Sequence, residues 1–168
     1  ALLEEPSTSS PVVILHEPEG NRVLPIWIGE PESRAIAVAF QKVDMSRPLT
    51  HTLMANMVLE LGAKLVRVVI ERIDGGTYYA YLQLQNSDGD LVEVDARPSD
   101  SIALALEFNA SIYVSRSVLD AASQENPFPA EGIPAQKAKE EFSDDELLDL
   151  KRLLDKARER EREEGEDD

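Results

Sequence analysis

The chain has 168 residues, a formal net charge of −16 and no cysteine. The missing cysteine excludes disulfides, thiolate metal sites and a cysteine nucleophile. The acidic balance disfavours a protein that coats nucleic acid, because such binding relies on lysine and arginine to neutralise phosphates. The acidic balance is weaker evidence against an enzyme that uses a divalent metal, because the metal supplies positive charge. No apolar run approaches the roughly 20 residues that span a bilayer, so we expect no membrane partner and a cytoplasmic location.

Two strands open the chain, at residues 11–16 and 22–28, on either side of a Glu-Gly-Asn turn. A helix with small alanines is predicted over about 32–42. A second helix ends near Gly62, because glycine is a common stop just past a helix.

Three strands then form a predicted meander over 65–73, 77–85 and 91–95, with glycine-containing turns between them. Alternation places apolar side chains on one face and polar ones on the other, including Tyr79 and Tyr81. An apolar helix over about 99–108 and a strand over 110–114 follow. The sequence therefore predicts an α/β fold of the α+β type, with a mixed, mostly antiparallel sheet and helices packed on one face.

The composition changes after Arg116. Residues 1–116 are predicted to form one domain, whose N-terminal strand we expect to be truncated. Residues 117–141 contain several prolines and are predicted to be a linker or extended arm. Residues 142–168 are predicted to form an acidic C-terminal helix, opened by a capping box at 143–146, with a disordered tail from Glu161.

Two junctions share a strand–turn–helix pattern, EPESR at 30–34 and DARPSD at 95–100, each followed by an apolar helical run. The match indicates a possible internal duplication. If the junctions meet in space, Asp95, Asp100 and Glu32 could hold a divalent metal such as Mg²⁺ or Mn²⁺. The alternative is structural: Asp95 pairs with Arg97, and Asp100 caps the helix.

Three further side chains have both a functional and a structural interpretation. Arg97, at a helix start, and Arg47 could each grip a phosphate or form an ion pair. His51 lies in the first turn of a helix, where a neutral imidazole suits a general base or a metal ligand. It also lies on the apolar side of that helix and could be half-buried packing.

Several segments in order carry a family resemblance: LPIWIG at 24–29, RPLTH at 47–51, DGGTYYA at 74–80 and DARPSD at 95–100. Over roughly residues 8–116 the chain resembles the bifunctional nuclease domain family. The resemblance implies a mixed α/β domain and nuclease activity on DNA and RNA. Thr52 departs from the pattern where an acidic residue often follows the histidine, and Ser101 departs where alanine is usual.

The leading hypothesis is therefore a nuclease that hydrolyses phosphodiesters of DNA or RNA with Mg²⁺ or Mn²⁺. In it Glu32, Asp95 and Asp100 hold metal, His51 activates water, and Arg47 and Arg97 hold phosphate.

Two alternatives stay open. One is a non-catalytic binding or regulatory module that uses the acidic C-terminal helix for partners. The other is an enzyme acting on a small phosphorylated ligand. Tyr79 and Tyr81 could stack bases, but an exposed tyrosine-bearing sheet face is more typical of a subunit interface, so we expect a homodimer through it.

Overall fold

The protein is described by a computed structural model that covers residues 1–18, 20–126 and 144–166. Its backbone divides into two compact units, residues 1–30 with 119–168, and residues 31–118. None of the helices in the described ranges combines the length and apolarity that crossing a membrane requires.

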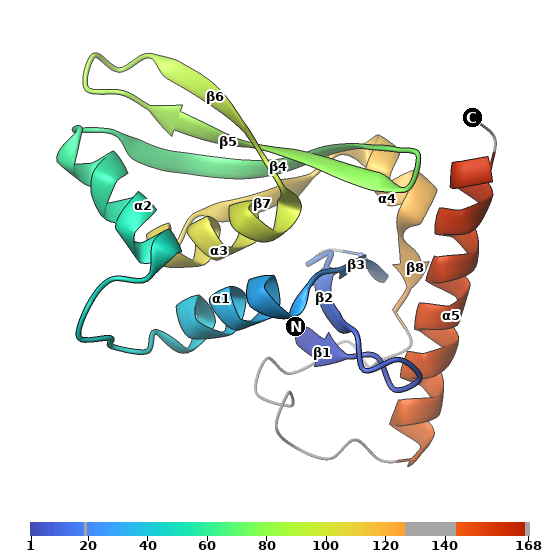
Figure 1. Cartoon of the computed structure of the whole chain (residues 1–168). Coiled ribbons are helices and arrows are strands. Elements are labelled where there is room, and N and C mark those ends of the chain that lie inside the picture. The colour runs from blue at the N-terminus through green and yellow to red at the C-terminus, as the bar shows by residue number, and fades with distance from the viewer. Residues whose placement is uncertain (19, 127–143, 167–168) are drawn as a thin grey trace. The chain divides into compact units, whose positions relative to one another are not determined.

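The first unit is built on an antiparallel sheet with the strand order β1-β2-β3-β8. Its strands are β1 (Leu2–Glu4), β2 (Pro11–His16), β3 (Arg22–Trp27) and β8 (Gln124–Glu125). The long helix α5 (Asp144–Glu166) lies along this unit (Figure 1). Side chains of α5 and of the sheet together form one apolar cluster: Leu3, Val12, Ile14, Val23, Leu153 and Leu154.

A buried ion pair also ties α5 to the first unit. The carboxylate of Glu5 is only 1% exposed, and Arg158 of α5 reaches it with Nη2 at 2.7 Å. The same guanidinium lies 5.4 Å from the ring centre of Trp27. Because a buried carboxylate without a countercharge is costly, Glu5 depends on α5 being in place.

The second unit is a four-stranded sheet with the order β6-β5-β4-β7, covered by helices. Its strands are β4 (Lys64–Asp74), β5 (Thr77–Gln85), β6 (Leu91–Ala96) and β7 (Ser111–Val114). All neighbours are antiparallel except β4 and β7, which are parallel. Its helices are α1 (Glu30–Gln41), α2 (Thr50–Glu60) and α3 (Pro98–Phe108), while α4 (Arg116–Ala122) continues into the first unit.

Helix α3 is the centre of the second unit, and Figure 1 shows it beneath the sheet with α2 beside it. It packs on β4 and β5, and α2 packs on it. The shared core contains Ala55 of α2, Leu104 of α3, and Val68 and Leu82 of the sheet. This packing fixes the first turns of α2 and α3 relative to each other, which matters for the site.

The predicted fold class is confirmed, but the strands form two sheets where one was expected. The early strands β2 and β3 pair with β1 and β8 and do not join the meander. Sequence patterns locate strands but do not specify distant partners, and β8 is supplied by residues about a hundred positions beyond β3.

The predicted linker and tail need correction. Residues 117–122 of the predicted arm belong to α4, in which Val118 and Ala122 are buried, at 0% and 5% exposed. The prediction of disorder from Glu161 is wrong, because α5 continues to Glu166. Arginine and glutamate are strong helix formers, so a charged run continues a helix that is already nucleated. Residues 127–141 of the predicted arm, and residues 142–143 with Ser143 of the capping box, lie outside the described residues.

Candidate active site

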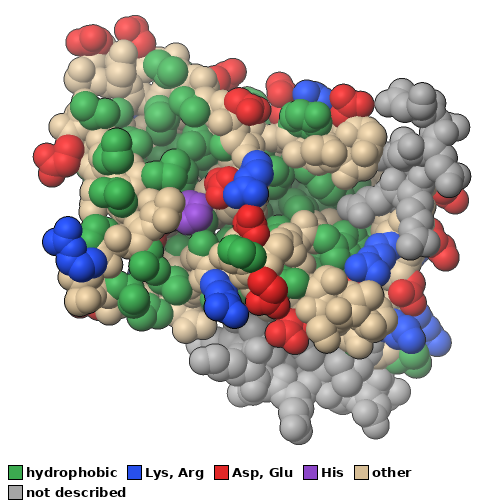
Figure 2. Space-filling view, viewed as in Figure 1, with side chains coloured by type: hydrophobic (Ala, Val, Ile, Leu, Met, Phe, Trp, Pro, Cys, Tyr) green, Lys and Arg blue, Asp and Glu red, His purple; other side chains and the backbone are tan. Residues whose placement is uncertain are grey.

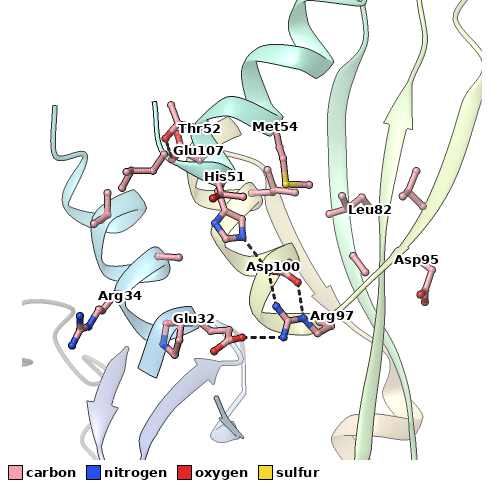
Figure 3. A pocket seen from close by; sticks show the side chains of 18 residues that line it. Glu32, Arg34, His51, Thr52, Met54, Leu82, Asp95, Arg97, Asp100 and Glu107 are labelled. Carbon is pink, nitrogen blue, oxygen red and sulfur yellow. Dashed lines mark hydrogen bonds and ion pairs between the residues drawn. The ribbon is translucent and has the colours of Figure 1, made fainter. Parts of the chain in front are cut away.

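A pocket of about 630 Å³ lies in the second unit, lined by residues of α1, α2, α3, β5 and β6 (Figure 3). Most of its wall is apolar, with charged and polar side chains gathered at particular points. Figure 2 shows hydrophobic side chains gathered on the part of the surface where α2 lies, with acidic, basic and histidine side chains among them. Four exposed large apolar side chains belong to α2: Leu53, Met54, Met57 and Leu59.

His51 and Asp100 form the centre of the polar cluster. His51 is the second residue of α2, and Asp100 lies in the first turn of α3. The Nε2 atom of His51 is 3.0 Å from Oδ1 of Asp100, and the His51 side chain is 15% exposed. Because a carboxylate only accepts hydrogen bonds, Nε2 must carry the proton, and Nδ1 of a neutral ring is then a free base. No hydrogen bond engages Nδ1 among the described residues.

Arg97 joins the second carboxylate to this pair. Its Nε atom donates to Oδ2 of Asp100 at 2.8 Å, Nη2 to Oδ1 of Asp100 at 3.3 Å, and Nη1 to Oε1 of Glu32 at 2.9 Å. The sequence explains its place: Pro98 favours an extended Arg97 and a helix that starts at once. Arg97 has φ −66° and ψ 148°, and the chain passes from β6 to α3 without a longer loop. The Arg97 side chain is 65% exposed, so a ligand in solvent can reach it.

These contacts keep the cluster charged. Partial burial by itself would raise the pKa of Asp100, but hydrogen bonds from Arg97 and His51, with the charges of both, hold that pKa below its ordinary value of 3.8. Hydrogen bonds to Asp100 and then to Glu32 raise the pKa of Arg97. Asp100 therefore stays a carboxylate throughout the neutral range and orients the imidazole.

The lowered pKa of Asp100 predicts a pH-dependent contribution to folding stability. A carboxyl whose pKa is lower in the folded than in the unfolded state stabilises the fold above its unfolded pKa. That contribution disappears as the pH falls below 3.8 and through the folded pKa. We expect Asp100→Asn to lower the melting temperature at pH 7, with the difference from wild type closing in acid. Calorimetry from pH 2 to 7 measures this, with Asp88→Asn in the exposed β5–β6 turn as the control. A difference in melting temperature that persists in acid would contradict the lowered pKa of Asp100.

The predicted site residues divide into three groups. Glu32, His51, Arg97 and Asp100 meet through the hydrogen bonds described above, so the two junctions do converge. Asp95 also lines the pocket, but on β6 it lies apart from the four (Figure 3).

Arg47, the remaining predicted residue, is exposed in the segment between α1 and α2 and is not among the residues that line the pocket. The structural alternative for the acidic residues is also wrong in detail: Arg97 pairs with Asp100 and Glu32 rather than Asp95, and no side chain caps α3.

The three predicted metal ligands do not surround one point. Glu32 and Asp100 face the guanidinium of Arg97, and Asp95 is separate. Within the described ranges, no three His, Asp or Glu side chains are grouped so that they could hold an ion. The residues do not fit a metal in this arrangement, because both nearby carboxylates already pair with the guanidinium of Arg97. The Mg²⁺ or Mn²⁺ dependence thus stays a prediction.

The sequence analysis missed a second polar pair in the same pocket. The hydroxyl of Thr52 donates to Oε1 of Glu107 at 2.9 Å. Glu107 lies two turns after Asp100 on α3, and Thr52 follows His51 on α2, so the same two helices are linked twice. The signal was the spacing on α3, since residues seven apart share a helix face. Arg34 of α1 lines the pocket as well.

Comparison with known proteins identifies the family of this chain. The sequence profile described as the bifunctional nuclease domain matches residues 13–127, and the chain therefore belongs to the bifunctional nuclease domain family.

Its relatives include an uncharacterized protein found in two strains of Mycobacterium tuberculosis, 39% identical over 153 residues that make up 91% of this chain and 88% of that protein. "Bifunctional nuclease 2" of Arabidopsis thaliana is 29% identical over 109 residues, or 64% of this chain and 33% of the plant protein. "Bifunctional nuclease 2" of Oryza sativa subsp. japonica is 30% identical over 116 residues, or 67% and 35%.

Proposed function

We propose that this protein is a nuclease that hydrolyses phosphodiester bonds of DNA, RNA or both in the pocket of the second unit. The observation that carries the proposal is the linked set His51, Asp100, Arg97 and Glu32, in a chain of the bifunctional nuclease domain family. The names of the plant relatives support the reaction class.

His51 is the general base. Its free Nδ1 takes a proton from a water molecule as the water oxygen attacks phosphorus. The bond between phosphorus and the leaving sugar oxygen breaks, and that oxygen takes a proton from the imidazolium or from solvent. The products are a phosphomonoester and a sugar hydroxyl. Asp100 keeps the imidazole oriented and stabilises its protonated form, the role of the carboxylate in histidine–carboxylate pairs generally.

Arg97 holds the phosphate. A guanidinium presents paired donors that match phosphate oxygens, and this one is exposed beside the base. With a neutral His51, however, Arg97 and its two carboxylates together carry one negative charge. An incoming phosphate must therefore draw Arg97 partly away from Glu32, or a cation must compensate.

A divalent ion remains part of the proposal on this ground. Glu32 and Asp100 would be its available ligands once Arg97 had turned toward the phosphate, and the ion would supply the positive charge that the cluster lacks. The roles of His51 and Arg97 do not depend on it.

The test is cleavage of end-labelled single-stranded RNA and DNA by the purified full chain, in Mg²⁺, in Mn²⁺ and in EDTA. Cleavage that persists after treatment with EDTA would separate the nuclease proposal from the metal proposal. If no condition gives cleavage, the nuclease proposal is overturned, and the binding or regulatory module becomes the better interpretation. That alternative has lost one support: the α5 residues Leu153, Leu154 and Ala157 are buried and do not present an apolar face to a partner.

Arg97→Lys tests the phosphate role. Lysine keeps the charge but loses the paired donors, so we expect KM to rise about ten- to a hundredfold, which is the value of a charged hydrogen bond of about 1.5–3 kcal/mol. The measurement is steady-state cleavage of a short oligonucleotide. Arg116→Lys, an exposed position outside the pocket lining, is the matched control and should leave KM unchanged. An unchanged KM in Arg97→Lys would remove Arg97 from substrate binding.

The homodimer through Tyr79 and Tyr81 and the cytoplasmic location stay predictions. Both tyrosines are half-buried on the sheet face away from α3, and the guanidinium of Arg72 lies 3.4 Å from the ring centre of Tyr79. The ring of Tyr79 is therefore already partly engaged within the chain.

A further inference from the structure

The pocket is longer than the catalytic cluster, and its far end has its own polar group. Asp100 and Glu107 both line it from α3, two turns apart, which is about 10 Å along the helix axis. Figure 3 shows the Thr52–Glu107 pair on the far side of His51 from Arg97. A nucleotide spans a similar length from its phosphate to the outer edge of its base. A phosphate held at Arg97 therefore brings the base toward Glu107.

The apolar part of the pocket lining suits a flat aromatic ring. It includes Val38, Met54, Leu82 and Val94. Such a surface packs against the flat faces of any base and does not discriminate among the four bases. The pocket volume of about 630 Å³ lies within the range of small-ligand sites.

Glu107 discriminates among the bases by hydrogen bonding. Its Oε1 accepts from Thr52 at 2.9 Å, and among the described residues nothing engages Oε2. A carboxylate accepts hydrogen bonds and cannot donate them. Guanine presents two adjacent donors on its Watson–Crick edge, the ring N–H and the exocyclic amine. Adenine and cytosine place an acceptor beside their amine, and uracil and thymine flank one donor with two acceptors, so each of these sets a lone pair against the carboxylate.

We propose, resting on the nuclease function above, that this end of the pocket binds a guanine base, with Glu107 as its specificity-determining residue and Thr52 as a positioning residue. The base must leave its stack to enter, because the Watson–Crick edge is occupied in a duplex. Single-stranded nucleic acid is therefore the substrate, and the scissile phosphate is the one attached to a guanosine.

Binding of mononucleotides to the full chain tests the inference without cleavage. Calorimetric titration with GMP, AMP, CMP and UMP should give GMP the lowest Kd, by about 5- to 150-fold, as for other paired base contacts. Glu107→Gln should abolish that preference, because an amide sets a donor where guanine also donates. Glu60→Gln, an exposed glutamate on α2, is the matched control and should keep the preference.

Thr52 gives a second, independent test. Thr52→Val removes the hydroxyl that orients Glu107 and should reduce the guanine preference, while Thr52→Ser should retain it. If the pair were only a tie between α2 and α3, both Glu107→Gln and Thr52→Val would lower the melting temperature and leave the base preference intact.

Mapping cleavage products on single-stranded oligonucleotides completes the design. Cleavage confined to phosphates attached to guanosine supports the inference. Cleavage without base preference, or equal binding of the four nucleotides, overturns the guanine site and leaves the nuclease proposal standing. Selective GMP binding by a protein that cleaves nothing would overturn the nuclease proposal and keep the guanine site.

Discussion

His51→Ala should lower kcat for phosphodiester cleavage about 100- to 10,000-fold, the range that a positioned general base contributes. The reason is the geometry of the ring: Asp100 holds Nε2 at 3.0 Å, and Nδ1 is left to accept the proton of water. The KM should change little, because the phosphate is assigned to Arg97. The measurement is single-turnover cleavage of a labelled oligonucleotide at saturating enzyme.

The chain provides a matched control for this variant. It contains only two histidines, and the other, His16, is exposed at the end of β2 in the first unit. His16→Ala should retain wild-type cleavage. Equal loss in both variants would point to a general effect on folding or to a contaminant. Full activity of a folded His51→Ala protein would exclude His51 as the base.

Leu154→Ala should destabilise the first unit by about 2–5 kcal/mol, as removal of a buried leucine side chain usually does. Leu154 of α5 is 0% exposed and packs in the cluster with Leu3, Val12 and Ile14 of the sheet. The alanine side chain would leave a cavity between α5 and the sheet, where Leu154 now packs.

Urea denaturation followed by tryptophan fluorescence measures this loss. Trp27 is the sole tryptophan and packs against the same cluster, so its emission reports on the first unit. Leu148→Ala is the control, because Leu148 lies on the same helix but is 47% exposed. It should change stability by no more than about 0.5 kcal/mol. Similar losses in the two variants would mean that α5 contributes through helix propensity rather than packing.

The sequence predicted the elements of the second unit well, because their patterns are strong. The meander, the apolar α3 and the end of α2 near Gly62 all lie within a residue or two of expectation. Alternation within the first strand of the meander would place Val66 with Val68 and Ile70 on the apolar face, but Val66 is 41% exposed. The pairing register shifts between Leu65 and Arg67, so an irregularity reverses the faces there.

The edge position of β6 explains a second difference between expected and observed burial. Alternation places Val92 and Val94 on the apolar face of the meander, and they lie across from Leu84 and Leu82. They are nevertheless 45% and 41% exposed, because β6 is the edge strand of its sheet. Sequence alternation gives the face of a side chain but not whether a helix reaches that far along the sheet.

The sequence predicted most residues of the site from their types at two strand–helix junctions. It did not predict which of these side chains contact one another. Asp100 and His51 are 49 positions apart, and their contact depends on how α2 packs against α3. Asp95 was grouped with Asp100 because they are close in sequence. As a strand residue it lies opposite Tyr81, on the face turned away from α3, while Asp100 is already in the helix. The Thr52–Glu107 pair was missed because its two residues are 55 positions apart, and their contact depends on the same packing of α2 against α3.

The placement of α5 bears on how the protein is made. The domain that the family shares ends at residue 127, yet the side chains that complete the core of the first unit come from Leu153 and Leu154. During synthesis β1, β2 and β3 leave the ribosome before α5, so their apolar face stays uncovered until α5 has been made. Contacts that span nearly the whole chain close slowly. A protein shortened at residue 127 would lack α5. The carboxylate of Glu5 would then have no Arg158 to pair with, and the apolar face of the sheet would be exposed to aggregation.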